Sequence, residues 1–233
     1  MNDPQLAARR ITLWLIWLAL TAAFCAVSVA WFDRPIAFFV HRELGQPFFL
    51  TQLPRISEWL VGAASVVFVL LGLRGLTGRP LSRLEAVILL CGLSIIVSAA
   101  LKNELKFVFG RTWPETWINN NPSLIRDGVY SFNFFRAGRA YESFPSGHTA
   151  AVCSAMSVLW LCYRRWRVLC AVTVLLVVIG LIGSDFHFLS DVVAGAFVGA
   201  STGWLAVLMW QAGGPRYITD DELRRAGEKA NSE

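Results

Sequence analysis

The sequence predicts an all-α fold: a polytopic membrane protein built as a six-transmembrane-helix bundle with an interfacial helix and a long outer loop. Two observations lead to this prediction. The chain of 233 residues is 55% hydrophobic and only 16% charged, and its apolar residues gather in six runs. Such a composition is typical of helices surrounded by lipid. Because no repeat or linker divides the chain, we expect a single membrane-embedded domain over residues 1–233.

The first apolar run, residues 11–32, has 22 uncharged residues, enough to cross about 30 Å of hydrocarbon. It follows Arg9 and Arg10 and lacks a cleavage site of small residues, so we interpret it as a retained span. Shorter runs can lengthen when a flanking charged side chain reaches the membrane surface. The five other expected spans are residues 59–73, 86–101, 149–163, 168–184 and 192–215.

Basic residues in the short loops predict the orientation. They precede the first run, separate the second from the third and the fourth from the fifth, and follow the sixth. With six spans they all lie on one side, which is then cytoplasmic. We therefore expect cytoplasmic N- and C-termini, a polar cytoplasmic tail at 213–233, and a place in the cytoplasmic (inner) membrane of a bacterium. The net charge of +5 mainly reflects this topology. The basic residues are scattered over short loops, which argues against a nucleic-acid-binding surface.

Three segments lie on the outer side. Residues 33–57 mix apolar and charged residues at helical spacing, which suits an interfacial helix, and we interpret His41 within it as an interfacial histidine without a chemical role. Residues 111–143 form a long segment rich in Trp, Asn and Phe, which favours an ordered functional loop. The third segment is the short turn around residues 184–190.

The stretch "SFPSGHTA", residues 143–150, stands at the start of the fourth run. Ser146 is a suitable N-cap and Pro145 ends the preceding loop, so a helix start explains the stretch without any chemistry. His148 raises the alternative that this helix start also carries a reactive group. The free backbone N–H groups at this helix start favour the binding of an anion.

The turn into the last run begins a stripe of residues spaced by four: His187, Asp191, Gly195, Gly199 and Gly203. Each step of four advances about 40° around a helix, so the stripe follows one face. The glycines predict a close helix contact. Ionisable residues on such a face, at a membrane boundary, usually serve function.

Two cations complete the group. Lys106 and Arg111 end the third run, at the same outer side as His148, His187 and Asp191. Either cation alone is equally explained as an interface anchor. Together with paired histidines and free N–H groups, they suit phosphoryl transfer.

In their order these residues resemble the type 2 phosphatidic acid phosphatase family, which shares its fold with vanadium haloperoxidases. The family's signatures are Lys-x6-Arg-Pro, Pro-Ser-Gly-His and Ser-Arg-x5-His-x3-Asp, and the resemblance covers about residues 84–205. Lys106 and Pro114 match the first signature, residues 145–148 complete the second, and His187 and Asp191 match the third.

Two positions depart from the family pattern. The first signature's arginine falls on Trp113 and the third's on Leu181, and residues 168–215 contain no Lys or Arg. In the family these arginines hold phosphate oxygens. Arg136 and Arg139, shortly before Ser146, are the candidates for a replacement guanidinium, since arginine offers bidentate geometry. The alternative is that both anchor the loop to lipid headgroups or pair with Glu142.

The resemblance implies a lipid phosphatase that hydrolyses a phosphate monoester or pyrophosphate of a membrane lipid at the outer face. His187 would form a phosphohistidine, and His148 would be the general acid. Asp191, one helical turn away, can fix the imidazole tautomer. The expected phosphate-binding residues are Lys106, Arg111, Ser146, Gly147, Arg139 and Arg136. Neither a cofactor nor a metal is implied, since no Asp/Glu cluster suited to Mg²⁺ is evident.

Other functions stay open at this point. A non-catalytic relative would bind lipid phosphates without turnover, and a phosphotransferase would pass the phosphoryl group to another lipid. A channel or transporter would need more polar residues inside the spans than the six runs contain. The sequence is compatible with phosphatidic acid, phosphatidylglycerol phosphate, an isoprenoid pyrophosphate or a lipid A phosphate as the substrate.

Overall fold

The computed structural model describes residues 4–78, 81–117 and 119–213, and within these ranges the chain is helical, with no strand and three isolated β-bridges. The predicted all-α class is therefore confirmed. The α-helices are α1 (Pro4–Val27), α2 (Asp33–Leu44), α3 (Phe48–Gln52), α4 (Arg55–Leu76), α5 (Arg83–Phe109), α6 (Leu124–Asp127), α7 (Gly147–Cys162), α8 (Arg167–Gly183) and α9 (Leu189–Ala212). A π-helix, η1 (Ser28–Phe32), and two 3₁₀ turns, η2 (Arg139–Tyr141) and η3 (Arg164–Trp166), complete the set.

Five helical stretches of the described chain are long and apolar enough to cross a membrane. They are Pro4–Leu44, Phe48–Leu76, Arg83–Phe109, Arg164–Gly183 and Leu189–Ala212. The remaining predicted span corresponds to α7, an apolar helix of 16 residues with a largely buried surface. Of the predicted polar tail, residues 214–233 lie outside the described residues.

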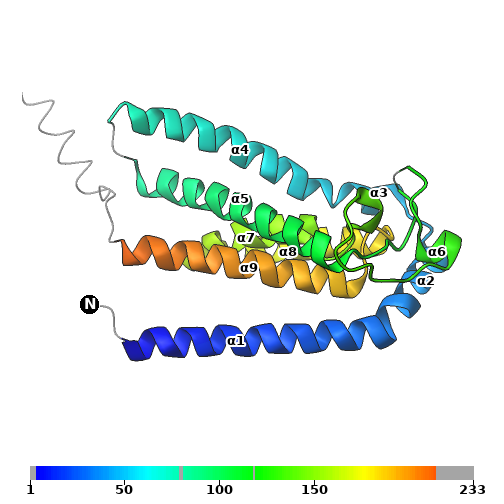
Figure 1. Cartoon of the computed structure of the whole chain (residues 1–233). Helices are drawn as coiled ribbons and strands as arrows, with labels where there is room; N and C mark the ends of the chain where they lie inside the picture. The colour runs from blue at the N-terminus through cyan, green and yellow to red at the C-terminus, as the bar shows by residue number, and fades with distance from the viewer. Residues whose placement is uncertain (1–3, 79–80, 118, 214–233) are drawn as a thin grey trace, which may run out of the picture.

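The helices run roughly alongside one another, with α1 and α4 on opposite outer sides (Figure 1). Helix α7 packs most extensively against α9 and then α5, while α1 packs mainly on α9 and α4 mainly on α5. The first described turn of α1 and the last of α9 lie at one end of the bundle, and α2, α3 and α6 lie at the other (Figure 1). Both candidate histidines belong to the end that carries α2, α3 and α6.

The glycine stripe of α9 provides the predicted close helix contact. A Cβ atom added at Gly195, Gly199 or Gly203 would lie 2.4, 2.2 or 2.4 Å from a backbone oxygen of α7 or its cap. No side chain fits there, so the backbones of α7 and α9 touch directly. This contact fixes the start of α9, which follows His187, relative to the start of α7, which carries His148.

Residues 33–57, whose pattern suits an interfacial helix, contain several helical segments and not one continuous helix. The first helix continues through η1 into α2 and ends at Gly45, whose left-handed backbone (φ 57°) lets its N–H bond the carbonyl of His41. The short helix α3 and the first turns of α4 follow. Helical periodicity does not show where a helix ends, and Gly45 and Pro47 interrupt it here, while the interfacial position of this segment stays a prediction.

The predicted ordered outer loop folds back across the end of the bundle. Isolated bridges join Arg111 to Phe132 and Glu142, and Trp113 to Ser123. The loop ends at Ser146, whose side chain accepts the N–H of Thr149 and caps α7, as predicted. The pairing of Arg111 with Glu142 brings the two ends of the loop together, next to the start of α7.

Candidate active site

A cavity of about 560 Å³ opens between α4, α5 and α7 at the end of the bundle that carries both histidines. We call it the histidine cavity. Its lining includes Glu58, Lys102, Lys106, Trp113, Gly147, His148, Phe186 and His187. Four sequence-predicted site residues, Lys106, Gly147, His148 and His187, therefore meet in one place.

His187 lies in the turn between α8 and α9 and is almost fully buried. The backbone N–H of His187 donates to the carbonyl of Leu181, and the ring Nδ1 lies 3.3 Å from Oδ2 of Asp191. A carboxylate only accepts, so Nδ1 carries the proton and Nε2 keeps its lone pair. Burial, more than any charge, lowers the pKa of His187 to about 4. The imidazole is thus neutral at physiological pH.

His148 is the second residue of α7, and its ring centroid lies 6.3 Å from that of His187. Phe186 makes an edge-to-face contact with each ring: its centroid lies 5.4 Å from that of His148 and 5.3 Å from that of His187. On the other side, Nε2 of His148 lies 3.4 Å from Oε1 of Glu58, a residue of α4. The sequence alone did not point to Glu58, because only the fold brings α4 to this helix start.

Two lysines of α5 supply positive charge. Lys106 is buried, and its ammonium lies 5.6 Å from the centre of the Trp113 ring. Lys102, one helical turn earlier, also lines the cavity, and its side chain lies over Gly147: a Cβ added there would be 3.1 Å from its Cδ and Cε. Sequence reasoning missed Lys102, although its spacing of four from Lys106 places both on one helix face.

Apolar residues fill the two positions where the family has arginines. Trp113 is buried, with its ring 5.2 Å from that of His187 and 5.5 Å from that of Phe186. Leu181 is fully buried in the core below the turn. The cavity consequently has an aromatic wall where a guanidinium was expected, and its cations are lysines.

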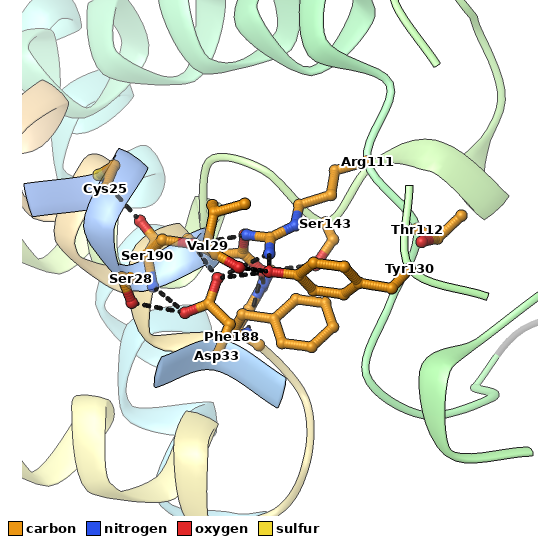
Figure 2. Close-up of polar contacts among 12 residues, drawn as sticks. Cys25, Ser28, Val29, Asp33, Arg111, Thr112, Tyr130, Ser143, Phe188 and Ser190 are labelled. Carbon is orange, nitrogen blue, oxygen red and sulfur yellow. Dashed lines mark hydrogen bonds and ion pairs between the residues drawn. The ribbon is translucent and has the colours of Figure 1, made fainter. Parts of the chain in front are cut away.

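Arg111 does not lie where the phosphate-binding prediction placed it. It does not line the histidine cavity, and its guanidinium is buried among Asp33, Asp191, Ser190 and Tyr130. Figure 2 shows Arg111 reaching the group formed by Asp33, Ser190 and Tyr130. Two buried carboxylates attract it more strongly than the half-open cavity does, so Arg111 is not available to a phosphate.

Ser146, Arg136 and Arg139 also lie outside the cavity lining. The Ser146 hydroxyl is buried and accepts from the backbone and side chain of Thr149. The Arg136 guanidinium stacks 4.1 Å from the centre of the Tyr141 ring. Arg139 is exposed, and its carbonyl accepts the indole N–H of Trp113. The expected replacement guanidinium is therefore not at the histidines, because each arginine has loop partners or solvent instead.

His41 has a structural contact that its interpretation as a bare interfacial histidine did not include. Its Nδ1 lies 3.0 Å from Oδ2 of Asp185, two residues before His187. The contact ties α2 to the turn that holds His187. Among the described residues, no group of three or more His, Cys, Asp or Glu side chains is arranged to hold a metal ion.

The chain is similar to several known proteins. The model of the PAP2 superfamily matches residues 87–214, more than half of the chain. A lipid A 1-phosphatase of Rhizobium etli is 29% identical over 209 residues, which cover 84% of this chain and 83% of the relative. A lipid A 1-phosphatase of Rhizobium johnstonii is 30% identical over 115 residues, 49% of this chain and 43% of the relative.

A solved structure shows the same fold. The PAP2 type phosphatidylglycerolphosphate phosphatase of Bacillus subtilis matches with a TM-score of 0.56 and 21% identity, over 89% of this chain and 98% of that one. At this identity the likeness concerns the fold alone. The resemblance inferred from the three signatures is confirmed by the match over residues 87–214: the chain belongs to the PAP2 superfamily.

Proposed function

We propose that this protein is a membrane lipid phosphatase that removes a phosphate group from a lipid through a phosphohistidine on His187. One observation carries the proposal: a carboxylate-paired histidine, a second histidine and two lysines line one cavity between apolar helices. The two lipid A 1-phosphatases among its relatives support the same class of reaction.

The reaction begins when Nε2 of His187 attacks the phosphorus atom of the lipid phosphate. A P–N bond forms, the P–O bond to the lipid breaks, and the leaving oxygen takes a proton from His148. A water molecule then attacks the phosphohistidine, loses its proton to His148, and inorganic phosphate leaves. Asp191 holds the His187 tautomer and stabilises the positive charge that develops on the ring.

The oxygens of the transferring group carry the negative charge. Lys106 and Lys102 face them from α5, and the N–H of Gly147 belongs to the free N–H groups at the start of α7. Lysine is a point charge without a bidentate fork, so this set grips a phosphate less rigidly than arginines do. Metal independence follows from the mechanism, in which lysines and histidines supply all the charge.

The proposal includes a topology. With α7 as the sixth span, the basic residues around η3, near the end of α4 (Arg74) and at the start of α5 (Arg83) lie at the end of the bundle opposite the histidine cavity. If that basic end is cytoplasmic, the active site faces the periplasm or the exterior. Both chain termini are then cytoplasmic, as the loop charges predict.

A lipid panel tests the proposed function. Purified protein in detergent, with a chelator present, should release phosphate from at least one of four substrates: a lipid A 1-phosphate, phosphatidylglycerol phosphate, phosphatidic acid and an isoprenoid pyrophosphate. Lipid A 1-phosphate should be tested first, because two relatives are lipid A 1-phosphatases. His187→Ala is the control for contaminating phosphatases. Release that survives this change, or that needs a divalent cation, contradicts the proposal.

A second function is favoured by the apolar residues at the two arginine positions. With Trp113 and Leu181 there, the protein would bind lipid phosphates without turning them over. In that case labelled lipid is retained by the wild type, no phosphate is released, and His187→Ala binds equally well. Adding an unphosphorylated acceptor lipid to the same assay also distinguishes a phosphotransferase, which would label the acceptor.

A further inference from the structure

We infer that Asp33 and Arg111 are positioning residues that set the charge and orientation of the Asp191–His187 pair. This inference rests on the proposed function in one respect: it assigns His187 the nucleophile's role. Asp33 lies outside the residues that match the family model, which begin at residue 87.

The local structure of the first helix directs Asp33 inward. Five residues, Ser28–Phe32, form the π-helix η1, and the wider turn is immediately followed by Asp33. Single π-turns inside α-helices frequently accompany functional sites. The Ser28 hydroxyl donates to Oδ1 of Asp33 at 2.7 Å, and the carboxylate is 1% exposed. An aspartate buried to this degree requires a cationic partner.

Arg111 is that partner, and it binds two carboxylates at once. Its Nη2 donates to Oδ2 of Asp33 at 2.7 Å and to the Tyr130 hydroxyl at 2.8 Å. Its Nη1 donates to Oδ1 of Asp191 at 2.5 Å and to the Ser190 hydroxyl at 2.6 Å. The rigid fork of arginine makes this possible, and a lysine ammonium cannot reproduce it.

The second oxygen of Asp191 faces the nucleophile. Oδ2 accepts from the Ser143 hydroxyl at 2.6 Å and from the Phe188 N–H at 3.0 Å, and it lies 3.3 Å from Nδ1 of His187. Asp191 thus has one oxygen held by Arg111 and the other directed at the imidazole. We call Asp33, Arg111, Tyr130, Ser143, Ser190 and Asp191 the buried charge network; all but the half-buried Tyr130 are buried. Figure 2 labels Asp33, Arg111, Tyr130, Ser143 and Ser190.

The charges of this network explain why two carboxylates are needed. Arg111 alone would neutralise Asp191 and remove the negative charge that stabilises a positive imidazole. Asp33 adds one negative charge, so that Asp33, Arg111 and Asp191 together carry a net charge of −1. The other charged or titratable groups that line the cavity beside His187 are Lys102 and Lys106 of α5, His148 of α7 and Glu58 of α4, and the one negative charge among them, on Glu58, contacts His148.

Titration of His187 by NMR tests the inference without requiring turnover. The chain has three histidines, so ¹⁵N-histidine labelling gives three ring systems, and His187→Gln identifies the signal of interest. Arg111→Gln leaves two carboxylates uncompensated and should raise the pH at which His187 titrates. Asp33→Asn should lower it. We expect shifts on the order of half to one pH unit, below the ~1–3 units that a directly adjacent charge causes.

Two further variants separate charge from shape. The double variant Asp33→Asn/Arg111→Gln restores the net charge of −1 and should return the titration toward that of the wild type. Tyr130→Phe removes hydrogen bonds to both groups without changing charge and should leave the titration in place. The double variant also provides the test if Arg111→Gln alone does not fold.

The inference is overturned if the two single variants shift the titration in the same direction, if neither shifts it, or if the double variant differs from the wild type as much as Arg111→Gln does. These outcomes do not depend on the proposed function. A wild type that releases no phosphate from any lipid refutes the phosphatase proposal, while opposite shifts in the two single variants would still support the network.

Discussion

Lys106 and Arg111 lie five positions apart in the chain but serve two contrasting regions on either side of the His187–Asp191 pair. In the buried charge network, every charge of Asp33, Arg111 and Asp191 is paired at hydrogen-bond distance. In the histidine cavity, the ammonium of Lys106 faces the Trp113 ring and has no hydrogen bond within the described part of the chain. Paired charges hold geometry, whereas unpaired charges in a cavity are available to a ligand.

The largest expected effect concerns the group between the two regions. His187→Ala should reduce lipid phosphate release by roughly 10³-fold or more, since losing a nucleophile removes the covalent route. His148→Ala should cost much less on an aryl phosphate than on a lipid, because a good leaving group needs no proton. Steady-state kinetics on both substrates measures this. Equal losses on both substrates for His148→Ala would contradict the assigned roles.

A direct comparison of the two cations follows. Lys106→Ala should lower kcat/KM by about 10²-fold, as for one lost transition-state donor, with the thermal transition almost unchanged. Arg111→Leu should instead destabilise the fold by about 3–5 kcal/mol, because it leaves buried carboxylates unpaired. Thermal unfolding in detergent together with kinetics distinguishes them. The comparison fails if Lys106→Ala unfolds the protein while Arg111→Leu leaves its stability intact.

The pH dependence tests the burial of His187. Its pKa is lowered to about 4, so the neutral nucleophile persists when the pH falls through the ordinary histidine value near 6.5. Because His148, the general acid, only gains protons as the pH falls, kcat/KM at pH 5 should be no lower than at neutral pH, whereas an unperturbed His187 would lose about 30-fold of its neutral form. The ionisation of the substrate's phosphate, followed by ³¹P NMR, must be corrected for. An acid limb near pH 6.5 after correction would show that His187 is not shielded from water.

Lys102 should contribute less than Lys106 because it is more exposed to solvent. Lys102→Ala should lower kcat/KM by roughly tenfold, less than the ~10²-fold of a buried donor. Gly147→Ala provides a matched steric variant, since the added methyl group would press on the Lys102 side chain. Its effect should nearly disappear in the Lys102→Ala background. Additive losses in the double variant would mean that the two residues act separately.

The smallest expected effect concerns Glu58, the one carboxylate among the described residues that line the cavity. Its negative charge opposes an incoming phosphate, so Glu58→Gln should tighten the binding of inorganic phosphate or orthovanadate several-fold. An exposed charge has a modest effect of this kind. Competitive inhibition constants at low and high salt measure it. Weaker binding in this variant would indicate that Glu58 orients His148 instead of repelling the anion.

Much of the fold follows from local sequence signals. The apolar runs predict the long helices, Ser146 predicts the start of α7, and spacing by four predicts that Gly195, Gly199 and Gly203 form a close contact. These features depend on neighbours within one or two helical turns, which the sequence displays directly. Lys106, Gly147, His148 and His187 stand at span ends that the alternation of loops places on one side of the bundle, which is why the sequence could group them.

The misplaced and missed residues depend on distant parts of the chain. Asp33 and Arg111 are 78 positions apart, and only the fold shows that Arg111 has a carboxylate partner there. Without Asp33, Arg111 resembles any cation at the end of a span, which is why it was predicted to bind phosphate. Glu58 was missed for the same reason, since its distance from His148 in sequence is 90 positions. Charge type is visible in a sequence, but charge pairing is not.

The close contact between α7 and α9 has a consequence for motion. Because no side chains separate these backbones, the two helices have little freedom to slide or part, and His148 and His187 at their ends should move as one body. Helix α4 is different: within it only Ser57 is buried, and it lines the cavity together with α5 without being part of this close pair. We therefore expect the entry and exit of a lipid to depend on excursions of α4, while the separation of the two imidazoles stays constant throughout the cycle.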